Sequence, residues 1–281
     1  MRYFIFFLLF NLTLVSCKTE KNKNIYKYNK DKTFKIISLA PSITRVLAEL
    51  NQINNIVGIS SYCFLADSLK NCVIGNLIEL NVEKIFLLKP DIVFLTNFAN
   101  KSDINILKKS NIEVYVLPKM SSFDDIMNNY LEIAKIVKQE KLAQKNIVKY
   151  KNKLDSLINI VKNKNKNPKI FFQISTNPIF GVIPETFMDD LIKYAGGINI
   201  LSELKRPMVS REYVLFKNPD VIFISIMGQT ANDEINKWKN YKFLNAIKNN
   251  KIFILNPDTA CQPTPSNFLI TLEKMVKLMY D

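Results

Sequence analysis

Residues 81–94 read N-V-E-K-I-F-L-L-K-P-D-I-V-F, and residues 210–223 read S-R-E-Y-V-L-F-K-N-P-D-V-I-F. In both segments a glutamate, Glu83 or Glu212, stands seven residues before Pro-Asp, and an apolar run follows. Asn and Ser are good helix N-caps, so each glutamate should occupy a first helical turn, where the helix dipole favours a carboxylate. This internal repeat of a helix and a strand predicts two similar α/β lobes.

The sequence around the repeat alternates in the same way. In the first half, apolar runs predict strands at 34–39, 56–60, 92–96 and 114–117, and helical spacing predicts helices after Ser42, at 82–89 and at 103–109. After Pro168 the pattern restarts, with strands at 170–174, 221–225 and 252–255 and helices near 187–195, 211–216, Trp238 and 267–279. Short strands that alternate with helices predict a parallel, Rossmann-like sheet in each half.

The segment that joins the halves is helical in pattern. Residues 123–166 contain no glycine and no proline, and their apolar spacing predicts two helices with a break near Gln139. The second helix, of about 23 residues, would be ~35 Å long. We therefore expect a leader at 1–17, a tether at 18–35, an N-terminal lobe at 36–137, one long backbone linker helix at 138–166 and a C-terminal lobe at 167–281. Because ligands favour clefts at domain interfaces, we expect a ligand cleft between the lobes.

Composition excludes several classes of chemistry. The 281-residue chain is 48% hydrophobic and has no histidine, which removes Ser-His-Asp and Cys-His catalysis and His-ligated zinc or haem. Neither a dinucleotide-binding nor a P-loop glycine motif is present. The neighbouring carboxylates of Asp124-Asp125 and Asp189-Asp190 should point in different directions on helices, so they make no shared acid/base pair. We expect no enzymatic activity, no cofactor and no metal held by the protein itself.

The net charge of +14 is concentrated in two segments. Residues 18–35 carry a net +5, residues 138–169 carry a net +8, and Arg2 carries the remaining unit. Nucleic-acid binders instead gather charge on one reading face, often with stacking aromatics. We expect no nucleic-acid partner: the charge is solvated, or it attracts the chain to an anionic membrane surface.

The first residues predict the compartment. Arg2 and a short apolar stretch have the pattern of a secretory signal that is too short to span a bilayer. The stretch ends in Leu14-Val15-Ser16-Cys17, which resembles a bacterial lipobox with Cys17 as the lipidated residue. The alternative is a buried N-terminal strand followed by an incidental cysteine. We expect an extracytoplasmic, periplasmic protein that a lipid anchors to a bacterial membrane. Cys63 and Cys72 could pair there, and the sequence leaves that open.

Several segments, taken in order, resemble one known family. They are I-S-L-A-P-S-I-T at 37–44, V-G-I-S-S-Y at 57–62, N-V-E-K-I at 81–85, K-P-D at 89–91, N-P-I-F at 177–180, G-G-I-N-I at 196–200 and V-S-R-E at 209–212. From about Lys35 to the C-terminus the chain resembles the periplasmic binding proteins of ABC importers for cobalamin and iron–siderophore complexes, and most closely the cobalamin-binding members. The resemblance implies a monomer that binds a metal complex in its cleft and delivers it to an ABC permease. It favours a corrinoid, cobalamin, as the ligand; the alternative is a ferric siderophore or haem.

The same resemblance implies roles for single residues. Glu83 and Glu212 match carboxylates that dock onto permease arginines, the alternative being simple helix-dipole carboxylates. Tyr62 and Phe180 match aromatic contacts of the corrinoid, the alternative being ordinary packing. Arg206, and likewise Leu77, stands where the cobalamin binders have a tryptophan; Arg206 would suit an anionic ligand. Asp258 matches a cleft loop, as do Thr259 and Gln262. An enzyme and a purely structural envelope lipoprotein are the competing classes of protein.

Overall fold

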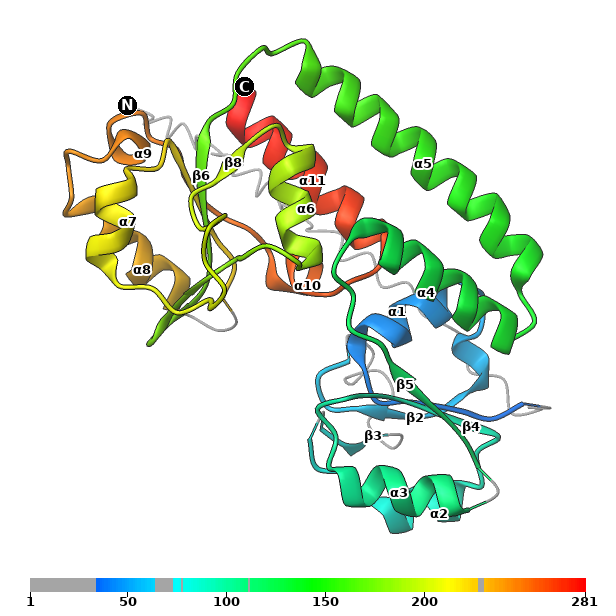
Figure 1. Ribbon diagram of the computed structural model, residues 1–281. Helices are drawn as coiled ribbons and strands as arrows, with labels where there is room; N and C mark the ends of the chain where they lie inside the picture. The colour runs from blue at the N-terminus through cyan, green and yellow to red at the C-terminus, as the bar shows by residue number, and fades with distance from the viewer. Residues whose placement is uncertain (1–33, 64–72, 77, 111, 227–229) are drawn as a thin grey trace, which may run out of the picture.

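The computed structural model describes residues 34–63, 73–76, 78–110, 112–226 and 230–281. Two α/β lobes are joined by a layer of helices, and the long helix α5 (Glu140–Lys162) runs along the side of that layer (Figure 1). The leader, the lipobox with Cys17, most of the tether, Cys72 and Leu77 lie outside the described residues.

The N-terminal lobe is a five-stranded parallel sheet with helices on both faces. The strand order is β3-β2-β1-β4-β5, formed by β1 (Ile36–Ser38), β2 (Ile56–Ser60), β3 (Val73–Gly75), β4 (Ile92–Thr96) and β5 (Glu113–Leu117). One face carries α1 (Pro41–Glu49) and α4 (Phe123–Ile136), and the other carries α2 (Val82–Leu88) and α3 (Lys101–Lys109) (Figure 1). The side chains of β4 alternate accordingly. Phe94 packs in the hydrophobic cluster that includes buried residues of α1 and α4, whereas Val93 and Leu95 pack in the cluster that includes buried residues of α2 and α3.

The C-terminal lobe repeats this plan with one departure. Its sheet has the order β10-β9-β6-β7, with β8 also on β6, and is formed by β6 (Lys169–Thr176), β7 (Ile179–Gly181), β8 (Ile198–Asn199), β9 (Val221–Ile224) and β10 (Ile252–Ile254). The expectation of parallel strands is wrong for β7, which pairs antiparallel with β6. Only Asn177 and Pro178 separate these two strands, and a two-residue connection allows only an antiparallel hairpin.

The remaining helices surround that second sheet. They are α6 (Phe187–Tyr194), α7 (Arg211–Lys217), α8 (Thr230–Lys239), α9 (Asn245–Lys248), α10 (Pro257–Ala260) and α11 (Pro265–Tyr280); a short 3-10 helix, η1 (Ile53–Asn55), precedes β2. The predicted strands and helices all occur in the predicted order, with ends that shift by a residue or two, and the structure adds β3, β7, β8, η1, α9 and α10. None of the described helices combines the length and apolar character that a membrane crossing requires.

The sequence repeat corresponds to a repeated structure. The side chain of Asn81 caps α2 by accepting the N–H of Lys84 at 2.9 Å, and Ser210 caps α7 by accepting the N–H of Tyr213 at 3.2 Å. Each helix ends in a left-handed residue directly before Pro-Asp, with a φ of 48° at Lys89 and of 46° at Asn218.

The two aspartates of Pro-Asp also have the same role. The carboxylate of Asp91 accepts the backbone N–H of Lys35 at 2.6 Å, and the carboxylate of Asp220 accepts that of Lys169 at 2.9 Å. Each aspartate therefore ties the strand after the repeated helix to the first strand of its own lobe. This explains why Pro-Asp occurs at the same place in both halves.

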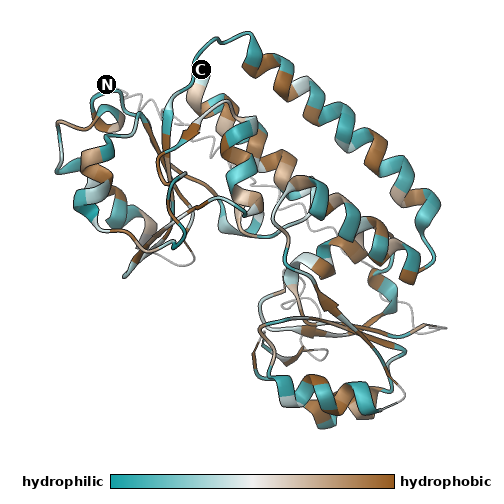
Figure 2. Cartoon of the chain, in the orientation of Figure 1, coloured by the Kyte–Doolittle hydropathy of each residue, from teal (hydrophilic) through white to brown (hydrophobic). Residues whose placement is uncertain are grey.

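One hydrophobic core extends through both lobes. It includes Phe94 of the first sheet, Tyr130 of α4, Leu157 of α5, Phe268 of α11 and Phe223 of the second sheet. Figure 2 shows the apolar strands inside each lobe and the mixed, partly polar surface of α5. Helix α4 ends at Ile136 and α5 begins at Glu140, which confirms the predicted break near Gln139.

Candidate functional site

A cavity of about 970 Å³ lies between the two lobes. All five strands of the N-terminal sheet end at this cavity, and the residues just after them line it: Ala40, Pro41 and Ser42 after β1, Tyr62 after β2, Asn76, Ile78 and Glu79 after β3, Asn97 and Phe98 after β4, and Pro118, Lys119 and Met120 after β5. Open parallel sheets bind ligands beyond the carboxyl ends of their strands, so this topology places a ligand site here.

The C-terminal lobe supplies the opposite wall. Phe187 contributes from the start of α6, and the loop around α10 contributes Pro257, Asp258, Cys261, Gln262 and Pro263. Burial raises the pKa of the Cys261 thiol, so the cleft presents this residue as a neutral thiol. The buried side-chain oxygen of Gln262 has no hydrogen-bond partner in the described part of the chain, which leaves an acceptor for a ligand donor.

The cleft surface is mainly apolar and aromatic, with a few polar groups. Tyr62 is 60% exposed and Phe98 is 70% exposed, although large aromatic side chains normally bury most of their area. Phe187 adds a third ring from the other lobe. Within the described ranges, no three His, Cys, Asp or Glu side chains come together to hold a metal ion. The apolar and aromatic lining of the cleft suits a bulky, partly apolar molecule.

The structure brings together only part of the predicted ligand site. Tyr62 and Asp258 line the cleft from opposite lobes. Phe180 lies in the edge strand β7, half-buried and bridged to Met208 by backbone pairing, and Arg206 lies in an exposed loop. The described lining of the cavity includes neither of these two residues.

Sequence reasoning missed Phe98, Met120 and Phe187 as lining residues. The first two follow directly after predicted strands, so the rule that ligands bind at carboxyl ends could have found them. Phe187 is the first residue of α6, and it reaches the cleft only because of how the two lobes pack together. The local sequence around Phe187 does not predict this placement.

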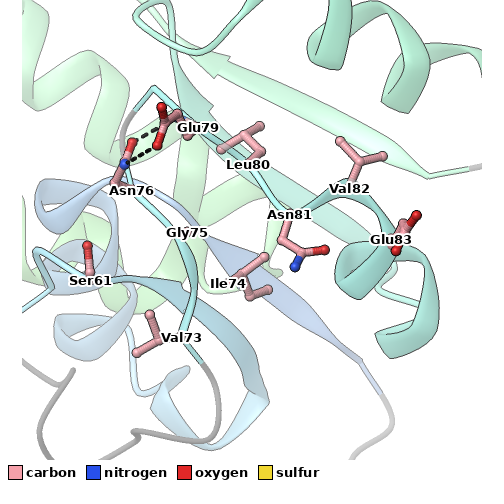
Figure 3. A pocket seen from close by; sticks show the side chains of 10 residues that line it. All are labelled: Ser61, Val73, Ile74, Gly75, Asn76, Glu79, Leu80, Asn81, Val82 and Glu83. Carbon is pink, nitrogen blue, oxygen red and sulfur yellow. Dashed lines mark hydrogen bonds between the residues drawn. The ribbon is translucent and has the colours of Figure 1, made fainter.

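A second pocket, of about 640 Å³, lies beside the cleft in the N-terminal lobe (Figure 3). It shares Asn76 and Glu79 with the cleft and extends to Glu83 at the start of α2. The side chain of Asn76 accepts the backbone N–H of Glu79 at 2.8 Å and donates to the Glu79 carboxylate at 3.3 Å, so polar contacts hold these two residues together (Figure 3).

The repeated glutamates lie outside the cleft. Glu83 and Glu212 are both exposed, on the first turns of α2 and α7. These helices lie on the outer parts of the two lobes, away from α5 (Figure 1). The backbone N–H of Glu212 and the Ser210 hydroxyl lower the pKa of the Glu212 carboxyl, which keeps it ionised.

Helix α7 is fixed to its lobe by a buried polar network. Arg211 donates to the Glu234 carboxylate at 2.7 Å, and its guanidinium stacks 4.2 Å from the centre of the Trp238 ring. Gln173 of β6 donates to the same carboxylate at 3.0 Å and accepts the Trp238 indole N–H at 2.8 Å. Arg211 precedes Glu212 directly, so the network fixes the helix turn that carries Glu212.

Residues 36–259 match the family described as "Periplasmic binding protein". The chain belongs to this family. Its members are solute-binding components of transport systems. The predicted resemblance and the predicted fold class, two Rossmann-like lobes with parallel sheets, are thereby confirmed, with the antiparallel strand β7 as the exception.

The relatives differ in the ligand that their names state. The vitamin B12-binding protein of Vibrio cholerae is 28% identical over 236 residues, which cover 82% of this chain and 84% of that protein. A crystal structure of a periplasmic vitamin B12 binding protein of Vibrio cholerae superposes with a TM-score of 0.74 at 26% identity, covering 87% of this chain and 96% of the other. A periplasmic heme binding protein of the same species gives a TM-score of 0.76 at 20% identity, covering 88% and 99%, and shows the fold alone.

Proposed function

We propose that this protein is the substrate-binding lipoprotein of an ABC importer, and that it captures a corrinoid, cobalamin, and delivers it to the membrane permease. The observation that carries the proposal is the cleft of about 970 Å³ at the ends of all five N-terminal strands. The similarity to vitamin B12-binding proteins over more than four fifths of the chain supports the choice of ligand. The protein would carry its cargo without changing it, so no catalytic residue is needed.

The lining of the cleft fits a corrinoid chemically. A corrin ring offers a broad apolar face with polar amides at its edge, and flat aromatic side chains pack well against such faces. Tyr62 and Phe98 would take the place of the two tryptophans that this chain lacks. Gln262 and Asn97 offer polar contacts for the ring substituents. Without histidine, the protein has no imidazole to offer to cobalt, so the cargo keeps its own ligands.

Phe180 and Arg206 are proposed to contact the cargo outside the cavity. Both lie outside the cavity lining, so they would contact parts of the cargo that extend beyond the cleft. The Arg206 guanidinium would suit an anionic group there, such as a phosphate or a carboxylate.

Haem, or a ferric siderophore, is the second candidate ligand because of two side chains that line the cleft. The Tyr62 side chain is largely exposed inside the cleft, and tyrosine oxygen is a known ligand of haem iron. Lys119 at the cleft wall could meet a cargo carboxylate. This alternative changes the cargo and keeps the transport role.

Titration of the purified protein with cyanocobalamin, hemin and a ferric hydroxamate siderophore tests the choice. Cyanocobalamin should bind with a Kd of about 1 μM or tighter, which corresponds to about −8 kcal/mol, by calorimetry. Saturation with hemin or the siderophore and no heat with cyanocobalamin would move the assignment to the second candidate. A hemin spectrum that changes in Tyr62→Phe would identify the tyrosine as the iron ligand.

The proposed membrane anchor rests on the N-terminal sequence, and the proposed permease contacts rest on the internal repeat. Lipidation of Cys17 would hold a monomer at the outer face of a bacterial membrane, in the periplasm, with the basic segment 18–35 as a tether. Glu83 and Glu212, one on each lobe, would each meet a cation of the permease. Nucleic acid has no part in this role.

A further inference from the structure

We propose that Leu87 and Phe216 are a matched pair of apolar docking residues, one per lobe, that seat the protein on its permease. The inference rests on the proposed function, because it concerns the surface around Glu83 and Glu212. Leu87 is 81% exposed and Phe216 is 83% exposed. In the described part of the chain, the next most exposed large apolar side chain is Phe98, at 70%, and Phe98 belongs to the cleft.

The two residues occupy the same position of the internal repeat. Leu87 stands four residues after Glu83 in α2, and Phe216 stands four residues after Glu212 in α7. Residues four apart lie on one face of a helix, so each lobe presents a carboxylate and an apolar side chain side by side. The core-facing position of the repeat behaves normally, because Ile85 and Val214 are both fully buried.

Some neighbouring repeat positions differ in chemistry between the lobes, whereas Phe86 and Leu215 are both apolar. Lys84 corresponds to Tyr213, and Leu88 corresponds to Lys217. Leu87 and Phe216 are both large and apolar, although a polar residue at either exposed position would leave its helix intact. A single exposed apolar residue needs no explanation, but its recurrence at one repeat position on both lobes does.

The partner that fits this pattern has two equivalent halves. Each half would present a cation to the glutamate and a shallow apolar recess to the side chain one turn further on. The recess must accept a leucine on one side and a phenylalanine on the other. Charge would set the encounter rate and the register, whereas burial of the apolar side chains would slow dissociation.

Because the charged and apolar residues should affect different rate constants, binding kinetics can test the proposal. The full-length protein is passed over its cognate permease in nanodiscs, and association and dissociation rates are measured at several salt concentrations. Leu87→Ser and Phe216→Ser should each raise the dissociation rate about tenfold, and the double variant should raise it about a hundredfold, with association and its salt dependence nearly unchanged. Glu83→Lys with Glu212→Lys should instead slow association in a salt-dependent way.

Two controls distinguish specific docking from nonspecific apolar binding and from misfolding. Val148→Ser removes an apolar side chain that is 59% exposed on α5, away from α2 and α7, and should leave the kinetics unchanged. Leu87→Met with Phe216→Leu keeps the apolar surface and should keep most of the binding. The melting temperature and the cyanocobalamin and hemin titrations of all variants should match the wild-type protein.

The outcomes distinguish this inference from the proposed function. If the glutamate reversals weaken docking and the double serine variant does not, the apolar pair is wrong and the transport role stands. If neither set of variants affects docking, the proposed docking surface fails and the pair fails with it. A Val148→Ser effect as large as that of Leu87→Ser would also overturn the pair.

Discussion

Replacing Glu234 by glutamine tests whether the buried network behind α7 supports the C-terminal lobe. The Glu234 side chain is fully buried, and one of its oxygens accepts hydrogen bonds from Arg211 and Gln173. Glutamine keeps the shape and removes the charge, which leaves the mostly buried Arg211 guanidinium without its counter-charge. Breaking a buried ion pair by removing one partner costs about 3–5 kcal/mol. Because Arg211 is partly exposed and stacks on Trp238, we expect the lower end, about 3 kcal/mol.

Urea unfolding followed by circular dichroism measures this loss. A loss of about 3 kcal/mol should lower the melting temperature by roughly 6–12 °C. Lys237→Gln is the matched control, because Lys237 lies 3.6 Å from the other Glu234 oxygen on an exposed side chain and should contribute at most ~1 kcal/mol. Arg211→Met combined with Glu234→Met should cost less than Arg211→Met alone. A Glu234→Gln protein within about 0.5 kcal/mol of wild type would refute the reasoning.

Four further predictions concern the anchor, the partner, the cargo and pH. Cys17→Ser should move the protein from the membrane to the soluble fraction, and mass spectrometry should find the acyl group only on the wild type. Reversing Glu83 and Glu212 to lysine should abolish cargo uptake in permease proteoliposomes and leave cyanocobalamin affinity unchanged. Tyr62→Ala should weaken cyanocobalamin binding by about 1–2 kcal/mol in calorimetry, as expected for a lost aromatic contact. Burial raises the pKa of Glu49 above its ordinary 4.5. The contribution of Glu49 to stability is therefore present below pH 4.5 and is lost as the pH rises through the folded pKa. In unfolding free energies measured against pH, Glu49→Gln should reduce this decline.

Most of the fold could be predicted from local sequence because the two repeated segments carry their own capping and turn chemistry. The strands β3, β7 and β8 were missed. Each has three residues or fewer, which is too short for a periodic pattern, and the pairing of β7 is fixed by the two-residue turn before it.

The candidate site was harder to predict than the fold. Tyr62 follows a predicted strand directly, so both motif and topology place it at the cleft. Phe180 shares a motif with the family, but its place in the edge strand β7 puts it outside the cavity lining. The exposure of Leu87 and Phe216 depends on which helix face packs on the sheet, and apolar spacing in a seven-residue helix cannot settle that.

The core that passes from the first sheet through α4, α5 and α11 into the second sheet determines how the protein can move. A swing of the lobes apart from each other would have to deform this shared core, and close packing opposes such a deformation. The distance between the two walls of the cleft should therefore change little when a ligand binds. Small-angle scattering should then give the same radius of gyration for the empty and the loaded protein.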